Sequence, residues 1–251
     1  MGDYARAFFM EKFCTGVNLF KGVTFPQVDE YDKVIVEQKG RRLLEDVMSP
    51  VNVQTFVAKS TTATIYYPQI YLPEHLPTAQ SINHLICDIV NGLIEKQYKE
   101  QDTDEFGEMI GTFEVKANER NILSITFMNY AIIPFAAHGL TFMESLNVNV
   151  KSGKVYELSD LFKSGSNYQR RLTNIINKQI KERQLDVFSP DGIDTIPSDQ
   201  RFYLTDQTLV IYFQQYDIAP YYVGLPLFPI PIYELEDIVS DHGPLDILSG
   251  N

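Results

Sequence analysis

Histidine and cysteine are the side chains that most often hold a catalytic metal, and this sequence places them singly. The four histidines stand apart from one another, at His75, His84, His138 and His242. None forms an HExxH or HxH pattern, and the two cysteines, Cys14 and Cys87, form no CxxC motif. A metal held by ligands distant in sequence stays open, but the spacing predicts no metal site and no cofactor.

Signatures of nucleophilic and nucleotide chemistry are missing from the sequence as well. There is no GxSxG elbow, no Walker A loop and no GxGxxG turn. Asp191 and Asp194, in SPDGIDT, lack the spacing and the bidentate glutamate of an EF-hand, so they are interpreted as turn formers. The sequence therefore does not predict a catalytic residue.

Carboxylates gather in one short stretch, at Asp102, Asp104, Glu105 and Glu108. A glycosidase needs one carboxyl in an apolar pocket and a second across a cleft, about 5–10 Å away. Neighbours in a predicted acidic turn do not meet that condition, so a solvated turn is favoured. A hydrolase that uses carboxylates from separate strands is the alternative.

An aromatic turn is the most promising contact surface in the sequence. Within the segment Gln215–Ile232, Pro220 and Gly224 fix the turn Tyr216–Gly224. Tyr221 and Tyr222 are neighbours, so in an extended chain one points inward and one outward. Exposed tyrosines on a rigid turn make good anchors, and the predicted ligand-binding residues are Tyr216, Tyr221, Tyr222 and Pro226. In the alternative, both tyrosines pack under the turn and hold the last strand.

Charge is unevenly distributed along the 251 residues, whose net charge is −12. Residues 151–183 carry eight basic and three acidic groups, whereas residues 184–251 carry Arg201 against eleven acidic groups. Such a field repels nucleic acid and attracts a basic protein. Acidic loops that merely keep the protein soluble are the other interpretation.

Hydrophobic periodicity predicts an α+β fold, with an antiparallel sheet and two long helices packed on one side of it. One helix is expected from an N-cap at Thr78 to about Lys99, and the other from about Asn167 to Gln184. Strands are expected at 53–71, 112–115, 122–130, 144–150, 155–158, 202–204, 208–214 and 225–233, with a hairpin turn at 118–121, an exposed crossover at 131–143 and a terminal helix at 233–239. The predicted domains are an N-terminal extension (1–50), the α+β domain (51–239) and a C-terminal tail (240–251).

The residues alone do not indicate the cellular compartment of the protein. No apolar run approaches the roughly 18 residues of a membrane span, and the charged N-terminus does not resemble a signal peptide. A disulfide between Cys14 and Cys87 is less favoured than a buried, reduced Cys87. Whether the two cysteines pair therefore stays open.

Two blocks of sequence carry a family resemblance. LNVNVKSGKVYELSDLF at 146–162 and LVIYFQQYDIAPYYVGLPLFPIPIYEL at 209–235, with AHGLTFMESLN at 137–147, resemble the C-terminal extracellular domain of RsiV-type anti-sigma factors. The same domain resembles the accessory region of PdaC-type peptidoglycan deacetylases. The resemblance covers about residues 53–239 and implies an extracytoplasmic α+β domain of Gram-positive bacteria.

In RsiV-type proteins this domain is a receptor for lysozyme, a basic protein, so the resemblance implies lysozyme or a cell-wall glycan as the partner. This sequence departs from both families. It shows no transmembrane helix and no clear sigma-binding segment in residues 1–50, and it lacks the deacetylase's paired Asp and HxxxH motif. The favoured hypothesis is a non-catalytic binding or sensor module of the cell envelope or spore. An envelope hydrolase and a purely structural or assembly protein are the alternatives.

Overall fold

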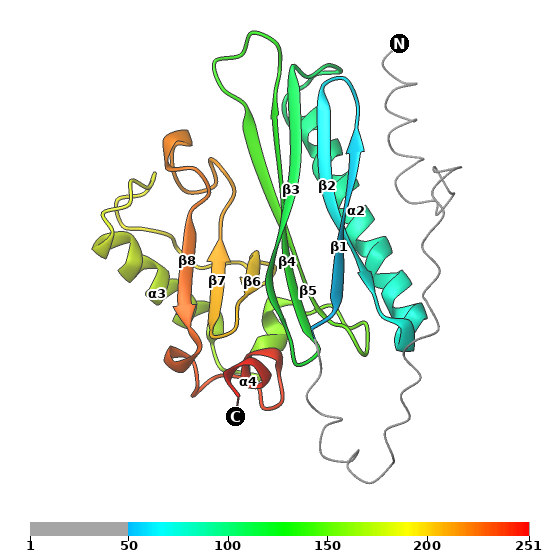
Figure 1. Ribbon diagram of the computed structural model, residues 1–251. Coiled ribbons are helices and arrows are strands. Elements are labelled where there is room, and N and C mark those ends of the chain that lie inside the picture. Colours follow the sequence, from blue (N-terminus) through cyan, green and yellow to red (C-terminus); the bar gives the residue numbers. More distant parts are fainter. Residues whose placement is uncertain (1–49, 251) are drawn as a thin grey trace. The chain divides into compact units, whose positions relative to one another are not determined.

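Two β-sheets and their covering helices make up the part of the chain that the computed structural model describes, residues 50–250 (Figure 1). The strands are β1 (Asn52–Lys59), β2 (Ala63–Tyr71), β3 (Glu108–Glu119), β4 (Ile122–Ile132), β5 (Leu140–Asn149), β6 (Phe202–Leu204), β7 (Thr208–Tyr212) and β8 (Leu227–Pro231). The α-helices are α2 (Leu76–Glu100), α3 (Tyr168–Glu182) and α4 (Pro244–Ser249). Short 3₁₀ helices are η1 (Pro73–His75), η2 (Leu158–Leu161), η3 (Tyr221–Val223) and η4 (Ile232–Glu234).

The prediction of a mixed helix and sheet fold is confirmed, but the single antiparallel sheet is corrected. The first sheet has the order β1-β2-β3-β4-β5 and the second the order β6-β7-β8. All pairs are antiparallel except β2 and β3, which run parallel over Ala63–Ile65. This pair is parallel because α2 carries the chain from the end of β2 back to the starting edge of the sheet.

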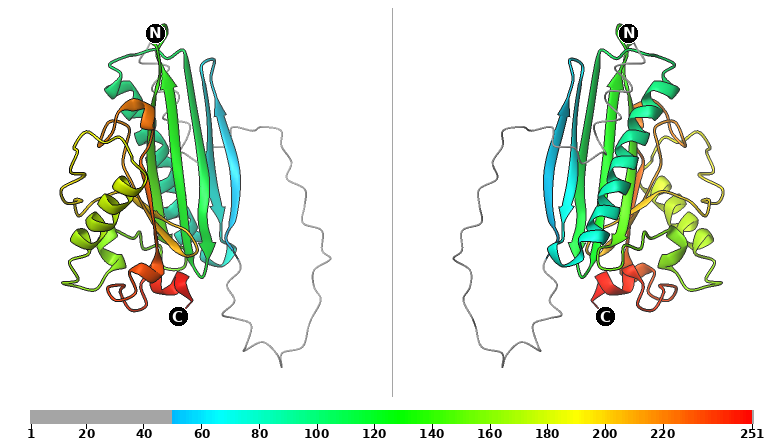
Figure 2. Two further views of the ribbon diagram at one scale, coloured as in Figure 1. Left: turned by 90° about the vertical axis from the view of Figure 1, so that its left-hand side faces the viewer. Right: turned by 90° about the vertical axis from the view of Figure 1, so that its right-hand side faces the viewer.

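The two long helices cover different sheets, which corrects their predicted placement on one side. Helix α2 runs along one face of the five-stranded sheet (Figure 2), where Ile82, Ile86 and Leu93 are buried. Helix α3 packs on the second sheet at β8. Helix α2 begins at Leu76, before the predicted Thr78, because a proline is well accommodated in a first helical turn.

The hairpin of β3 and β4 was predictable from its turn. Arg120 and Asn121 have φ of 49° and 65°, the left-handed values that a two-residue hairpin turn requires. The segment 131–143 is not the predicted exposed crossover. Strand β5 already begins at Leu140, and Phe142 and Met143 are buried.

Strand β5 lies between α2 and the second sheet. The ammonium of Lys96, on α2, lies over the ring of Phe142, 4.5 Å from the centre of that ring. The next residue, Met143, packs with Tyr203 and Tyr212 of the second sheet. Successive side chains point to opposite faces of a strand, so the first sheet is covered on both faces at this edge.

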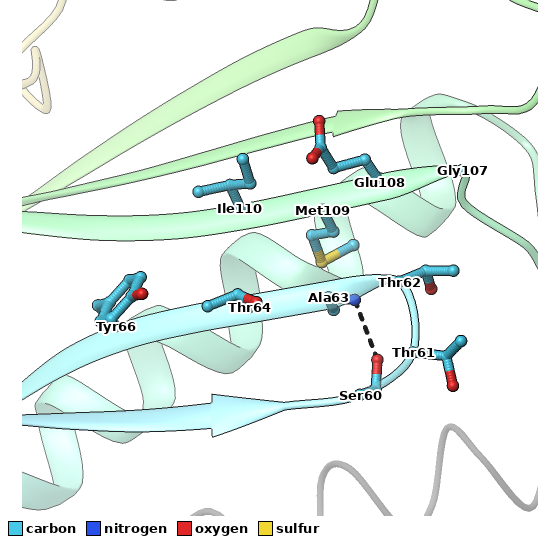
Figure 3. A pocket seen from close by; sticks show the side chains of 10 residues that line it. All are labelled: Ser60, Thr61, Thr62, Ala63, Thr64, Tyr66, Gly107, Glu108, Met109 and Ile110. Atoms are coloured by element: carbon cyan, nitrogen blue, oxygen red, sulfur yellow. Dashed lines mark hydrogen bonds between the residues drawn. The ribbon is translucent and has the colours of Figure 1, made fainter.

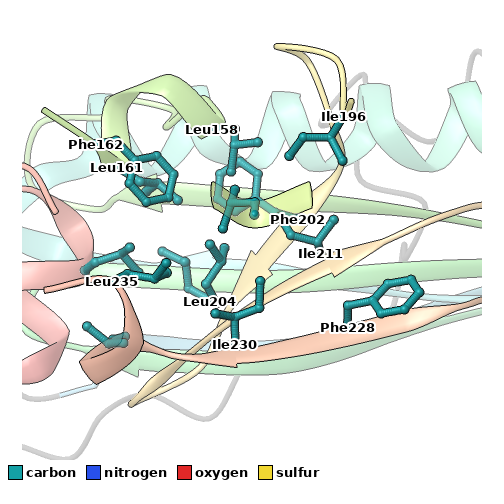
Figure 4. Packing of buried hydrophobic residues seen from close by; sticks show 14 of the residues in the cluster. Leu158, Leu161, Phe162, Ile196, Phe202, Leu204, Ile211, Phe228, Ile230 and Leu235 are labelled. Carbon is teal, nitrogen blue, oxygen red and sulfur yellow. The ribbon is translucent and has the colours of Figure 1, made fainter. Parts of the chain in front are cut away.

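A larger hydrophobic core fills the space between α3, η2 and the second sheet (Figure 4). Leu172, Ile176 and Ile180 of α3 are buried there. The segment 155–158 forms an isolated bridge at Val155 and enters η2, instead of the predicted strand. Residues 232–239 contain η4 instead of the predicted terminal α-helix.

Residues 240–250, expected as a tail, contain α4. Its Leu245 and Leu248 are buried in the same core, against residues of the second sheet. Cys87 is buried in α2, and its predicted alternative partner Cys14 lies outside the described residues, as does the N-terminal extension. None of the described helices combines the length and the apolar character that a membrane span requires.

Candidate binding surface

The predicted aromatic turn is a rigid connection between β7 and β8. Its base is closed by the amide of Phe213, which donates to the carbonyl of Pro226 at 3.0 Å. The Asp217 carboxylate accepts from the amide of Gln214 at 2.8 Å. Tyr216 has a φ of 67°, a left-handed value that is uncommon for a bulky residue. Such a conformation persists only where its surroundings fix it, and it often marks a functional surface.

Three of the four predicted binding residues gather on the outside of this turn. Tyr222 is 72% exposed and Tyr216 47% exposed. Tyr221 is half-buried, with its ring 6.0 Å from that of Tyr216. Pro226 is buried and presents no free surface. The two neighbouring tyrosines differ in exposure because they lie on the 3₁₀ helix η3, not because of the alternation of a strand.

The loop between β4 and β5 supplies aromatic neighbours that the sequence did not suggest. The His138 ring stacks on Tyr221 with 4.0 Å between the centroids and 23° between the planes. Phe135, in the same loop, is fully exposed. Directly after this loop, the amide of Thr141 in β5 donates to the side chain of Gln215, which precedes the turn, at 2.7 Å. Phe135 has a positive φ of 65°, a backbone conformation that no pattern in the sequence indicates.

The loop 186–194 borders the turn on another side and brings carboxylates to it. The Tyr222 hydroxyl donates to Asp186, and the amide of Phe188 donates to the carbonyl of Ile218 at 2.9 Å. Phe188 is 59% exposed. Between the loop and the turn lies a shallow cavity of about 250 Å³, lined by Val187, Phe188, Ser189, Gly192, Ile193, Asp194, Asp217 and Ile218.

We call these groups together the aromatic–acidic surface. It comprises Phe135, His138, Asp186, Phe188, Asp191, Asp194, Tyr216, Asp217, Tyr221 and Tyr222. The carboxylates are exposed and belong to the stretch in which Arg201 is the sole Lys or Arg. Arg201 is bound to Glu144 at 3.1 Å. Arg183, just before the stretch, donates to the carbonyl of Leu227 at 2.7 Å. The surface thus combines exposed rings with carboxylates that form no ion pair within residues 50–250.

A second cavity, of about 350 Å³, lies beside the β1–β2 turn (Figure 3). Hydroxyl-bearing side chains of Ser60, Thr61, Thr62 and Thr64 line it, with Tyr66 and Glu108. Figure 3 shows the carboxylate of Glu108 turned away from the turn at Ser60–Thr62. Like Asp102, Asp104 and Glu105, Glu108 is exposed, so this acidic cluster lacks the buried carboxyl of a general acid.

A third cavity, of about 310 Å³, contains Glu144, Glu157 and Asp199, carboxylates from separate elements. Two of the three have structural roles. Arg201 holds both oxygens of Glu144, at 3.1 and 3.2 Å. The Glu157 side chain accepts from the backbone of Asp160 in the capping box of η2. Over residues 50–250, no three His, Cys, Asp or Glu side chains come close enough together to hold a metal ion.

Comparison with known proteins finds a family match over part of the chain. Residues 159–233 match the family described as "Protein of unknown function (DUF3298)". This segment holds α3, the second sheet and the three exposed or half-exposed tyrosines of the turn. The chain is also 23% identical over 152 residues to the peptidoglycan-N-acetylmuramic acid deacetylase PdaC of Bacillus subtilis, a match that takes in 58% of this chain and 32% of that protein.

Two solved structures share the fold. A DUF3298 family member from Bacteroides fragilis has a TM-score of 0.59 at 14% identity, covering 80% of this chain and 98% of that one. A DUF3298 family protein from Pseudomonas aeruginosa has a TM-score of 0.56 at 16% identity, covering 76% and 95%. Identity this low shows the fold alone. The resemblance to the deacetylase is confirmed for this domain, and the one to RsiV-type anti-sigma factors stays a prediction.

Proposed function

We propose that this chain is a non-catalytic binding module that recognises a basic protein through the aromatic–acidic surface. The observation that carries the proposal is the juxtaposition of exposed Tyr216, Tyr222 and Phe188 with four exposed carboxylates. Tyrosines on a fixed turn are good anchors because little conformational entropy is lost when they bind. The carboxylates attract Lys and Arg side chains, and the rings offer them cation–π contacts.

The setting that we propose is the bacterial cell envelope. The support is the similarity to a protein whose name identifies it as a peptidoglycan deacetylase, although this chain spans 32% of that protein's length. Lysozyme fits such a setting because it is basic and acts on the same polymer. A net charge of −12 would speed the encounter with it and would disfavour binding to the anionic wall polymer. A non-enzymatic role agrees with the structural use of Glu144 and Glu157.

The test is a titration of the chain with lysozyme by calorimetry or biolayer interferometry, at low and at moderate salt. Binding should weaken as salt rises, because the attraction between exposed charges is screened. Tyr222→Ala should weaken binding by about 10-fold or more, as expected for an interface anchor. Tyr233→Ala is the matched control, because Tyr233 is 70% exposed and lies on η4, outside the aromatic–acidic surface.

Soluble peptidoglycan fragments form the second arm of the experiment. Binding of the fragments without binding of lysozyme would replace the proposed partner with a glycan. Absence of binding to both, or equal effects of Tyr222→Ala and Tyr233→Ala, would refute the proposed surface. Because Tyr222 is 72% exposed, its removal should leave the folded state intact, which a thermal melt can verify.

A further inference from the structure

The third cavity, of about 310 Å³, is built from three segments that are far apart in the sequence. Strand β5 supplies Glu144, the segment that leads into η2 supplies residues 155–159, and the approach to β6 supplies residues 198–202. Its volume lies at the lower end of the range of cavities that bind small molecules. The cavity shares no residue with the aromatic–acidic surface, so this inference does not depend on the proposed function.

Arg201 lines this cavity with most of its hydrogen-bonding capacity unused. Its Nε donates to both carboxylate oxygens of Glu144, at 3.1 and 3.2 Å. Its two terminal nitrogens donate to no group within residues 50–250, although they carry most of the N–H bonds of a guanidinium. The Arg201 side chain is 39% exposed, so a ligand can reach it. The terminal nitrogens of a guanidinium match the two oxygens of a carboxylate in geometry and in charge.

The backbone around Arg201 is fixed by the second sheet. The Arg201 carbonyl accepts from the amide of Tyr212 at 3.2 Å, and the side chain of Gln200 donates to the carbonyl of Tyr212 at 2.7 Å. Both Gln200 and Tyr212 are buried. An arginine that is held at its backbone by β7 and at its Nε by Glu144 loses little conformational entropy when it binds a ligand. The free end of the guanidinium is therefore preorganised for an anionic group.

A carboxylate without an ion-pair partner lines the same cavity. Asp199 is exposed and forms no ion pair with another residue of the described part of the chain. Glu157 adds a second carboxylate, although its side chain already accepts from the backbone of Asp160. The charges of Arg201 and Glu144 offset each other, so these two further carboxylates give the lining of the cavity a net negative charge.

We propose that this cavity binds a small zwitterion of the α-amino acid class. The carboxylate of the ligand lies against the terminal nitrogens of Arg201, and its ammonium group lies against Asp199. A simple anion uses the arginine but is repelled by the excess of carboxylates, and a simple cation makes no use of the arginine donors. A ligand that carries both charges a short distance apart uses both groups, and the exposed hydroxyls of Ser159 and Ser198 can bond to the rest of it.

Titration of the full chain with L-alanine, followed by calorimetry or ligand-observed NMR, tests the site. Alanine should bind with a Kd of about 0.1–5 mM, because a ligand of so few atoms supplies little binding energy. Propionate lacks the ammonium group and ethylamine lacks the carboxylate, so each should bind at least about 10-fold more weakly than alanine. Absence of alanine binding at about 20 mM would overturn the proposal. So would propionate or ethylamine binding as tightly as alanine, because the cavity would then be a plain anion or cation site.

Substitutions test the two charged contacts separately. Asp199→Asn should weaken alanine binding by about 10-fold, because the ammonium group loses its carboxylate, and it should not weaken the binding of propionate. Asp206→Asn is the matched control, since Asp206 is exposed in the β6–β7 turn, outside the cavity, and the change of charge is the same. Arg201→Gln should weaken alanine binding by about 10-fold or more, with a thermal melt to verify that the variant folds. Equal effects of Asp199→Asn and Asp206→Asn on alanine binding would overturn the proposal, whether or not the Arg201 variant folds.

Discussion

Replacement of Gln214 by Leu should destabilise the fold more than its small change in volume suggests. Gln214 is 4% exposed, and its side chain accepts from the Met143 amide at 3.0 Å and donates to the Met143 carbonyl at 2.5 Å. Leucine fills a similar space but offers neither bond. Met143 is itself 4% exposed, so water cannot replace the lost partners without opening the structure.

The magnitude follows from two buried backbone groups left unsatisfied. Each costs about 1–3 kcal/mol, so the free energy of unfolding should fall by about 2–6 kcal/mol. For a domain of this size, about 3 kcal/mol corresponds to a fall of about 6–12 °C in the melting temperature. Urea titration followed by circular dichroism measures the free energy, and an unchanged m-value would show that the unfolding transition itself is unaltered.

Gln215→Leu is the matched control. Gln215 accepts one bond, from the amide of Thr141 at 2.7 Å, and both residues are partly exposed, so water can take over. Its loss should cost about 0.5–1 kcal/mol. If Gln214→Leu cost less than about 1 kcal/mol, or no more than Gln215→Leu, the bonds between Gln214 and Met143 would not contribute as argued.

Three further substitutions test local features of the fold. Burial alone would raise the pKa of Asp160, but hydrogen bonds from Lys154 and the Glu157 amide, with the Lys154 charge, lower it below the usual 3.8. Asp160→Asn should therefore lower the free energy of unfolding by about 1 kcal/mol at neutral pH. In urea titrations, this difference in free energy from the native chain should disappear as the pH falls below about 4. A difference that persisted at pH 2 would contradict this. A Cβ at Gly139 would lie 2.4 Å from the carbonyl of Ala131, so Gly139→Ala should cost about 1–3 kcal/mol by thermal melt. Gly92→Ala meets nothing within 4 Å and should instead stabilise α2 by about 0.5–1 kcal/mol, and equal effects of the two would refute the steric reasoning.

The elements that sequence predicts well are those whose signals are local. Helix α3 has its apolar residues on one face, and Asn118–Asn121 is a short polar run between two strands. The parallel pairing of β2 with β3 is different, because it depends on how α2 returns the chain to the sheet. No residue pattern within either strand indicates that the two strands run parallel.

The residues of the aromatic–acidic surface likewise differ in whether the sequence predicts them. The tyrosines of the turn were predictable because Pro220 and Gly224 mark a turn next to aromatic residues. His138 was not, because its stacking on Tyr221 arises between residues far apart in the sequence. The burial of Pro226 follows from the closing bond to Phe213, which also depends on the tertiary fold.

The bonds between Gln214 and Met143 also set an order for events during synthesis. The chain emerges from the ribosome with β5 complete at Asn149, but the Gln214 that closes its edge follows 65 residues later. During that interval β5 is an open edge of the nascent sheet, and it can pair with other chains. A product that stops after Asn149 would keep this edge open, so premature termination in this region should give aggregates instead of a small soluble domain.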